Sequence, residues 1–333
     1  MLPNIKKFIF FLFSFCIFNA WNQDIHWSQF NDNQLFQNPA NAGNFYGDLR
    51  IIGNYRDQWR SVSVPFSTFS MSVDKQTKKL GYGIMAFHDQ AGDGKFSTIE
   101  LQGNVSYNLK LSADSAHNLR GGINFGMNHR QVNWNSFYFD SQFNGYVFNP
   151  ILPTNEVIQT DRKTNLSIGG GIVYDWVKNP RLRVSTGISA FNLNRPNQGF
   201  YNATIKRAIR YNGFLKATIA IKPMIDVIPS IQFSSQGTYQ ELVIGSSVKH
   251  YLPSKTFVYR AVYAGLWMRN KDACMLTLGY DHQDLFVGLS YDINLSKLLP
   301  ASNARGGFEI ALRYIINRFK PKRAEHRVCP DYI

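Results

Sequence analysis

The sequence predicts an all-β fold: a transmembrane antiparallel β-barrel of about 14 strands, preceded by a signal peptide and a short N-terminal lead-in or plug. Apolar and polar residues alternate with a period of two from about residue 47 onward, as strands with two different faces require. Charged residues make up 17% of the chain and aromatic residues 15%. Past the N-terminus, no run of about 18 apolar residues offers a helical membrane span. Barrel strands face lipid on one side and the lumen on the other, which explains this mildly polar average.

Residues 1–20 have the pattern of a secretory signal peptide. Lys6 and Lys7 form its basic start, residues 8–18 are apolar, and Ala20 is a small residue suited to cleavage. Bulky Phe15 before Cys16 argues against a lipidation site. We therefore expect cleavage and export.

The chain is basic, with a formal net charge of +14. No nucleic-acid-binding motif accompanies the charge, and the signal peptide also argues against a nucleic-acid partner. Anionic outer-membrane lipid or an acidic partner protein suits the charge better. Cleavage would leave Cys274 and Cys329, which are no disulfide framework, so we expect two unpaired thiols.

The alternation is clearest in residues 96–111, where Leu101, Val105 and Leu109 share one face and Gln102, Asn104 and Ser106 the other. The predicted strands are 47–56, 66–75, 79–88, 96–111, 119–133, 164–177, 181–192, 208–222, 226–236, 239–250, 256–269, 273–281, 285–294 and 305–316. An even number of strands about ten residues long is typical of outer-membrane barrels. A soluble β-sandwich would also alternate, but this many strands would split into two layers with the apolar faces inward.

Aromatic residues near strand ends favour the barrel, because amphipathic rings form girdles at the lipid head groups. Examples are Tyr55 with Trp59, Tyr174 with Trp176, and Tyr263 with Trp267. Beside them, Arg56 and Arg269 could stack on indole and reach a phosphate. We expect Tyr55, Arg56, Trp59, Trp267 and Arg269 to be interfacial anchors, with or without a role in recognition.

Loop lengths predict the orientation of the barrel. The connections after even-numbered strands are short, whereas 134–163 and 193–207 follow odd-numbered strands and are long. Short turns lie in the periplasm, so we expect the N-terminus there as well. The predicted organisation is a signal peptide at 1–20, a lead-in or lumen plug at 21–46, a barrel at 47–316 and a basic periplasmic tail at 317–333.

The long 134–163 loop carries more aromatic residues than a solvated loop needs. They are Trp134, Phe137, Tyr138, Phe139, Phe143, Tyr146 and Phe148. Such side chains are typical anchors of protein interfaces, so this loop is the first candidate for partner binding. The alternative is a loop folded inward that plugs the barrel.

Catalytic chemistry finds no support in the motifs of the sequence. The nucleophile elbow, the zinc-binding histidine pair and the phosphate-binding glycine loop are missing, so we expect no enzyme, no cofactor and no metal site. Residues 89–94 (DQAGDG) lack the alternating acidic ligands of a calcium loop and predict a hairpin turn. A barrel hydrolase would need Ser, His and Asp to converge in space near one rim.

A resemblance to a known family adds to this interpretation. It rests on residues 24–30 (DIHWSQF), 38–43 (NPANAG), 55–59 (YRDQW), 69–74 (FSMSVD), 89–94, 139–143 (FDSQF), 265–269 (GLWMR), 272–273, 288–294 (GLSYDIN), 306–310 (GGFEI) and 329–330. In number and order these segments resemble the PorP/SprF family of outer-membrane proteins, which serve the type IX secretion system. The resemblance covers essentially the whole mature chain.

The resemblance implies a type IX secretion accessory in the outer membrane. It would receive or tether a secreted surface protein, such as an adhesin, through the C-terminal signal domain of that protein, would contact other secretion components, and would support gliding. The alternative is a porin or a transporter of small hydrophobic solutes, because about 14 strands can enclose a solute path. Conductance in a bilayer would distinguish an open channel from a plugged anchor.

Overall fold

The computed structural model describes residues 24–58, 60, 64–92, 94–156, 160–200, 204–253, 258–296 and 299–317. The predicted signal peptide with Cys16, the anchor Trp59, and the basic tail beyond Asn317 with Cys329 lie outside the described residues. Cys274 is a free thiol, as expected.

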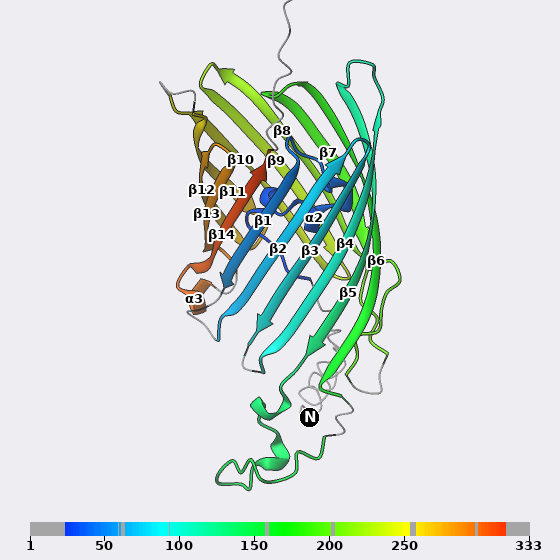
Figure 1. Ribbon diagram of the computed structural model, residues 1–333. Helices are drawn as coiled ribbons and strands as arrows, with labels where there is room; N and C mark the ends of the chain where they lie inside the picture. Colours follow the sequence, from blue (N-terminus) through cyan, green and yellow to red (C-terminus); the bar gives the residue numbers. More distant parts are fainter. Residues whose placement is uncertain are drawn as a thin grey trace, which may run out of the picture.

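The described residues form one closed antiparallel barrel of 14 strands (Figure 1). The strands are β1 (Leu49–Gln58), β2 (Phe66–Thr77), β3 (Leu80–Ala91), β4 (Phe96–Lys110), β5 (His117–Gln131), β6 (Arg162–Asn179), β7 (Leu182–Phe191), β8 (Arg210–Lys222), β9 (Ile225–Gln236), β10 (Tyr239–Tyr251), β11 (Arg260–Arg269), β12 (Ala273–His282), β13 (Leu285–Asn294) and β14 (Arg305–Ile316). Each strand pairs with its neighbours in sequence, and β1 pairs with β14 to close the barrel. The predicted fold class is confirmed.

Strand alternation places apolar side chains on the outside. In β4, Ile99 and Leu101 are 48% and 46% exposed, whereas Gln102 is 1% exposed inside the barrel. This arrangement is the reverse of a soluble sandwich, whose apolar faces point inward. The outer surface of the barrel is therefore suited to lipid.

None of the helices in the described part of the chain is long and apolar enough to cross a membrane.

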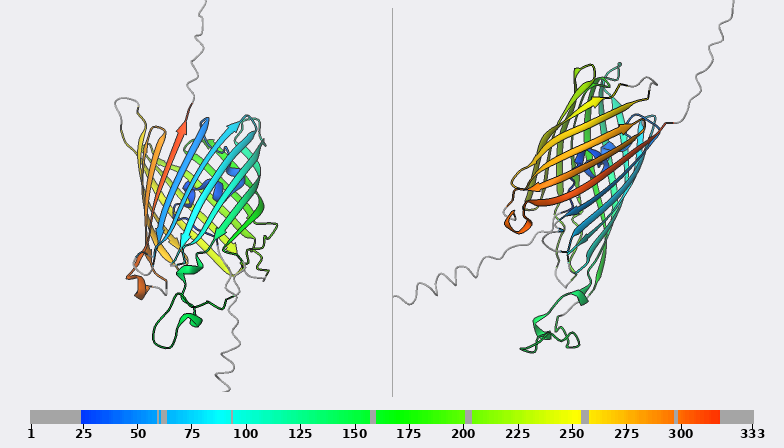
Figure 2. Two further views of the ribbon diagram at one scale, coloured as in Figure 1. Left: turned by 60° about the horizontal axis from the view of Figure 1, so that its bottom comes forward. Right: turned by 90° about the vertical axis from the view of Figure 1, so that its left-hand side faces the viewer.

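The two ends of the barrel differ. Short turns follow the even-numbered strands at one end, which we call the turn end; β1 begins and β14 finishes there. The connections after odd-numbered strands lie at the other end, the loop end, which carries the long β5–β6 connection (Figure 2). That connection holds the short helices η3 (Trp134–Ser136) and η4 (Asp140–Gln142), and α3 (Leu299–Ser302) lies between β13 and β14. Two connections at the loop end are short: the two-residue turn at Gly237 and Thr238 and the three-residue turn 270–272 between β11 and β12.

Residues 24–46, the inner segment, lie inside the barrel (Figures 1 and 2). They form η1 (Phe30–Asp32), α2 (Gln34–Gln37) and η2 (Pro39–Asn41), and Trp27, Leu35 and Ala40 are buried. The segment starts at the loop end, where the Asp24 amide donates to Gln236 Oε1 at 2.6 Å. It leaves at the turn end, where β1 begins. β1 thus begins at the turn end, as the loop lengths predict. Asp24, the first described residue, lies at the loop end instead.

Candidate functional site

Glycines in the barrel wall let the inner segment approach closely. A Cβ added to Gly122 on β5 would lie 2.4 Å from the Ala40 backbone nitrogen, and one added to Gly81 on β3 would lie 2.0 Å from the Ala42 carbonyl oxygen. Both distances are shorter than any ordinary contact of a Cβ atom. The absence of a side chain at these two wall positions therefore makes room for the backbone of η2 and of the residue after it.

Polar side chains also bind the start of η2 to two strands of the wall. Asn38 Nδ2 donates to the carbonyl oxygens of Ile172 on β6 and Ile188 on β7, at 3.1 and 2.9 Å. Its Oδ1 accepts from the Ala40 amide at 2.9 Å and so caps η2. Ser189 Oγ adds a bond to the Gln37 carbonyl oxygen at 2.8 Å. Buried polar groups are paired here, as they must be when water is excluded.

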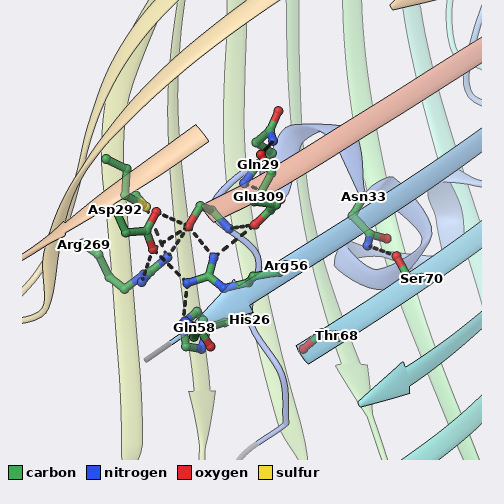
Figure 3. Close-up of polar contacts among 12 residues, drawn as sticks. His26, Gln29, Asn33, Arg56, Gln58, Thr68, Ser70, Arg269, Asp292 and Glu309 are labelled. Atoms are coloured by element: carbon green, nitrogen blue, oxygen red, sulfur yellow. Dashed lines mark hydrogen bonds and ion pairs between the residues drawn. The ribbon is translucent and has the colours of Figure 1, made fainter. Parts of the chain in front are cut away.

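Near the loop end, four charged residues on the wall form the loop-end cluster: Arg56 on β1, Arg269 on β11, Asp292 on β13 and Glu309 on β14 (Figure 3). Arg56 lies 2.8 Å from Asp292 Oδ2 and 3.1 Å from Glu309 Oε2, and Arg269 lies 3.4 Å from Asp292. All four side chains are buried. Buried charges need such pairing, because the removal of one partner leaves the other uncompensated.

The inner segment completes the loop-end cluster. The Ser28 amide donates to Glu309 Oε2 at 2.7 Å, and the Gln29 amide donates to Glu309 Oε1 at 3.0 Å. Ser28 Oγ donates to Asp292 Oδ1 at 2.6 Å. The wall therefore recognises the inner segment through carboxylates that accept its backbone amides, which gives strong charge-assisted hydrogen bonds.

Two ionisable groups of the inner segment have shifted pKa values. Burial opposes ionisation of Asp24, but Arg207 at 2.7 Å and Arg210 outweigh it and lower the pKa of Asp24 from 3.8 to about 2. Burial, and then the positive charges of Arg269 and Arg56, hold the pKa of His26 well below its ordinary value of 6.5. Asp24 is thus ionised and His26 neutral near pH 7.

Three predicted anchors face the lumen instead of the lipid. Arg56 and Arg269 belong to the loop-end cluster, and the Trp267 ring packs edge-on against Phe30 of the inner segment at 5.4 Å. The prediction was wrong because it followed nearness to a strand end, whereas the alternation of the strand decides which face a side chain takes. Tyr263 is lumenal for the same reason and donates to Asp281. Tyr55, 39% exposed, keeps its outward position.

Sequence reasoning missed Asp292, Glu309 and Ser28. A usable signal was present, because the closure of a barrel pairs the first strand with the last. In that register, Arg56 stands directly opposite Glu309. Oppositely charged side chains on the lumen-facing sides of β1 and β14 could therefore have been predicted as partners.

The aromatic loop, of which residues 132–156 and 160–161 are described, projects away from the loop end and does not fold into the lumen (Figure 2). Tyr146 and Tyr138 are 91% and 81% exposed. Phe137 and Phe143 are also exposed, and Phe139 and Phe148 are half-buried. Trp134 packs against Phe137 with ring centroids 5.8 Å apart, and Tyr138 packs edge-on against Phe148 at 4.7 Å. The alternative of an inward plug by this loop is therefore wrong; the segment inside the lumen is residues 24–46.

The described part of the chain holds no group of three or more His, Cys, Asp or Glu side chains arranged to bind a metal ion. His26 and Asp292 lie near one another by the loop end (Figure 3), and Ser28 bonds to Asp292, so the three residue types that a barrel hydrolase would need do come together. However, Ser28 Oγ donates to Asp292, while His26 Nε2 contacts Arg56 and Gln58. A nucleophilic serine needs a hydrogen bond to its base, and here the serine is bound to the carboxylate instead.

A closed antiparallel barrel with an apolar outer face and a polar lumen is the architecture of bacterial outer-membrane proteins. The family described as Type IX secretion system membrane protein PorP/SprF matches residues 20–314. The chain belongs to this family, and the protein is an outer-membrane barrel of type IX secretion.

Solved structures resemble the fold. The toluene transporter TbuX of Ralstonia pickettii has a TM-score of 0.51 and 8% identity over 86% of this chain and 94% of that one. A FadL homologue of Pseudomonas aeruginosa has a TM-score of 0.47 and 10% identity over 85% of this chain and 94% of that one. At 8% identity, the likeness to TbuX shows the barrel fold alone. None of the curated proteins compared matches the sequence.

Proposed function

We propose that this barrel receives a secreted surface protein at the outside of the cell and tethers it through the C-terminal signal domain of that client. The aromatic loop is the docking surface, and other secretion components deliver the client. A tethered adhesin would in turn support gliding. No covalent step is involved, which agrees with a family of secretion membrane proteins.

The exposure of aromatic side chains on the aromatic loop carries this proposal. Tyr138 and Tyr146 are 81% and 91% exposed on a loop outside the cell, and Val147 and Ile151 beside them are 61% and 90% exposed. Exposed apolar groups in one place are costly unless a partner covers them. Tyrosine is also enriched among the residues that carry the binding energy of protein interfaces.

The contents of the lumen favour a tether over a solute channel. The inner segment runs from one end of the barrel to the other and bonds to β1, β6, β7, β13 and β14. A porin or hydrophobic-solute transporter would need this segment to move. We therefore keep the channel as the alternative that the test must exclude.

The test uses purified full-length barrel and the isolated C-terminal domain of a type IX-secreted surface protein from the same cell. We expect the double variant Tyr138→Ser/Tyr146→Ser to weaken binding by about 10- to 100-fold, the usual effect of losing aromatic anchors. The matched control is Leu193→Ser/Ile205→Ser, which removes two exposed apolar groups from the β7–β8 connection at the same end. An equal loss in both variants would place binding elsewhere on the rim.

The same preparations are then placed in planar bilayers. A barrel that binds no client domain and conducts ions would contradict tethering and favour the channel. Client binding without conductance supports the tether.

A further inference from the structure

Two adjoining cavities lie on the turn-end side of the inner segment, with volumes of about 240 and 340 Å³. Together they form what we call the periplasmic chamber. Both are lined by Asn31, Pro180, Lys216, Thr218, Lys249 and Arg313. Pro180 lies in the turn between β6 and β7 and marks the turn-end side of the chamber, while Ser28 and Trp267 line the inner part of the first cavity beside the loop-end cluster.

Three of the four cations that line the chamber have carboxylate partners. Arg313 lies 2.7 Å from Asp32 of the inner segment, and Arg183 lies 2.6 Å from Asp175. Lys249 lies 3.9 Å from Asp281. Asp281 also accepts hydrogen bonds from Tyr259 and Tyr263 and lies 3.5 Å from Arg313, so its charge is already shared.

Lys216 is different. Its ammonium makes no hydrogen bond or ion pair with any of the described residues, although it lines both cavities. A lysine among arginines in a confined lumen is unfavourable unless an anion compensates it. Among the described residues, the chamber therefore has one positive charge with no ion pair of its own, because Asp32, the main carboxylate whose charge acts on Lys216, is already bound by Arg313.

The opposite wall of the chamber supplies hydrogen-bond acceptors. Asn31 and Asn41 of the inner segment donate through Nδ2 to Ser230 and to the Gln34 carbonyl oxygen. Their Oδ1 atoms accept nothing from the described residues. An ammonium donor facing amide acceptors matches a group that carries both a carboxylate and N–H donors.

The lumen already binds a polypeptide in this way. Asp24 and Asp32 of the inner segment each pair with an arginine of the barrel, Arg207 and Arg313. We propose that the periplasmic chamber binds a carboxylate-bearing polypeptide segment that enters from the periplasm, with Lys216 as its counter-ion. A periplasmic component that docks at this end would present the acidic segment. This inference goes beyond the client site outside the cell and does not depend on it.

The test measures binding of an acetylated tetra-aspartate peptide to the full-length barrel in detergent. A tetra-asparagine peptide and inorganic phosphate are the comparison probes. We expect the acidic peptide to bind, to weaken at high salt, and to bind more tightly than either comparison probe. Lys216→Met should weaken its binding by about tenfold or more, since a hydrogen bond between charged groups is lost.

Two further variants guard against a folding defect. Thr218→Glu adds a competing carboxylate to the same cavities and should also weaken binding by about tenfold or more, whereas Lys216→Arg keeps the charge and should retain it. The matched control is Lys222→Met, on the same strand but exposed and outside both cavities. Heat-modified migration on a gel verifies the closed barrel in each variant.

Equal binding of the acidic peptide by wild type, Lys216→Met and Thr218→Glu would overturn the proposal, and so would no binding at all. Binding of phosphate but not of the peptide would also overturn it, because it would assign the chamber to a free anion.

Discussion

A methyl group added at Gly122 should open the lumen of the barrel, because it would displace the inner segment. In Gly122→Ala the new Cβ would meet the Ala40 nitrogen at 2.4 Å, the Ala40 Cα at 2.5 Å and the Pro39 carbonyl carbon at 2.6 Å. All three are backbone atoms, so no side-chain rotation relieves the clash, and η2 must move away from β5. Overpacking of this kind costs about 1–3 kcal/mol.

Movement of η2 also strains the bonds of Asn38 to Ile172 and Ile188, each worth about 1 kcal/mol. A loss of about 3 kcal/mol in docking free energy would raise the population of the displaced inner segment by about 100-fold. Single-channel recording in planar bilayers measures this population as the fraction of time the barrel conducts. Wild type should stay closed almost throughout.

The control is the neighbouring residue. Gly121→Ala adds the same methyl group on the lipid side, where no atom lies within 4 Å of the new Cβ. Both variants change the strand equally, so only contact with the inner segment separates them. Equal open fractions in the two variants, or a wild type that already conducts, would refute the assignment of the inner segment as the closure of the lumen.

Two further predictions concern the loop-end cluster. Arg56→Met leaves Glu309 and Asp292 short of a buried partner and should destabilise the barrel by about 3–5 kcal/mol, seen as a lower thermal midpoint; an unchanged midpoint would contradict the pairing. Docking of the inner segment should weaken as pH falls below 6.5. The pKa of His26 is lowered while it is docked beside Arg56 and Arg269, so the released segment takes up a proton first. Protease accessibility of the segment against pH should show this weakening in wild type and lose it in His26→Gln.

The strands could be predicted from the sequence because their two faces meet different solvents. Residues 285–294 alternate without interruption, and β13 spans Leu285–Asn294. The match is poorer where alternation fades. A strand is predicted at 256–269, but β11 begins only at Arg260; residues 258 and 259 are not in a strand, and 256 and 257 lie outside the described residues. Lipid on one side and lumen on the other impose the period directly on the chain.

The site was harder to predict, because its contacts join residues far apart in the chain. Ser28 bonds to Glu309, 281 positions away. Asn38 reaches β6 and β7. The inner segment is also too short and too polar to show a period of its own. Its place inside the barrel depends on glycines such as Gly122, whose role is visible only when the backbone beside it is known.

The direction of the inner segment links the two ends of the barrel. Ser28 and Gln29 bind the loop-end cluster and also border the chamber, which Asn31, Asp32 and Asn41 line. One short stretch of backbone thus contacts both the loop-end cluster and, through Asp32 and Arg313, the cations of the chamber. A ligand that competes for Arg313 in the chamber would therefore weaken the hold on Asp32, only four residues from Ser28. Through that stretch, ligand binding in the chamber would change the contacts of the inner segment at the loop end, where we propose that the client docks. The strands of the barrel would not have to separate.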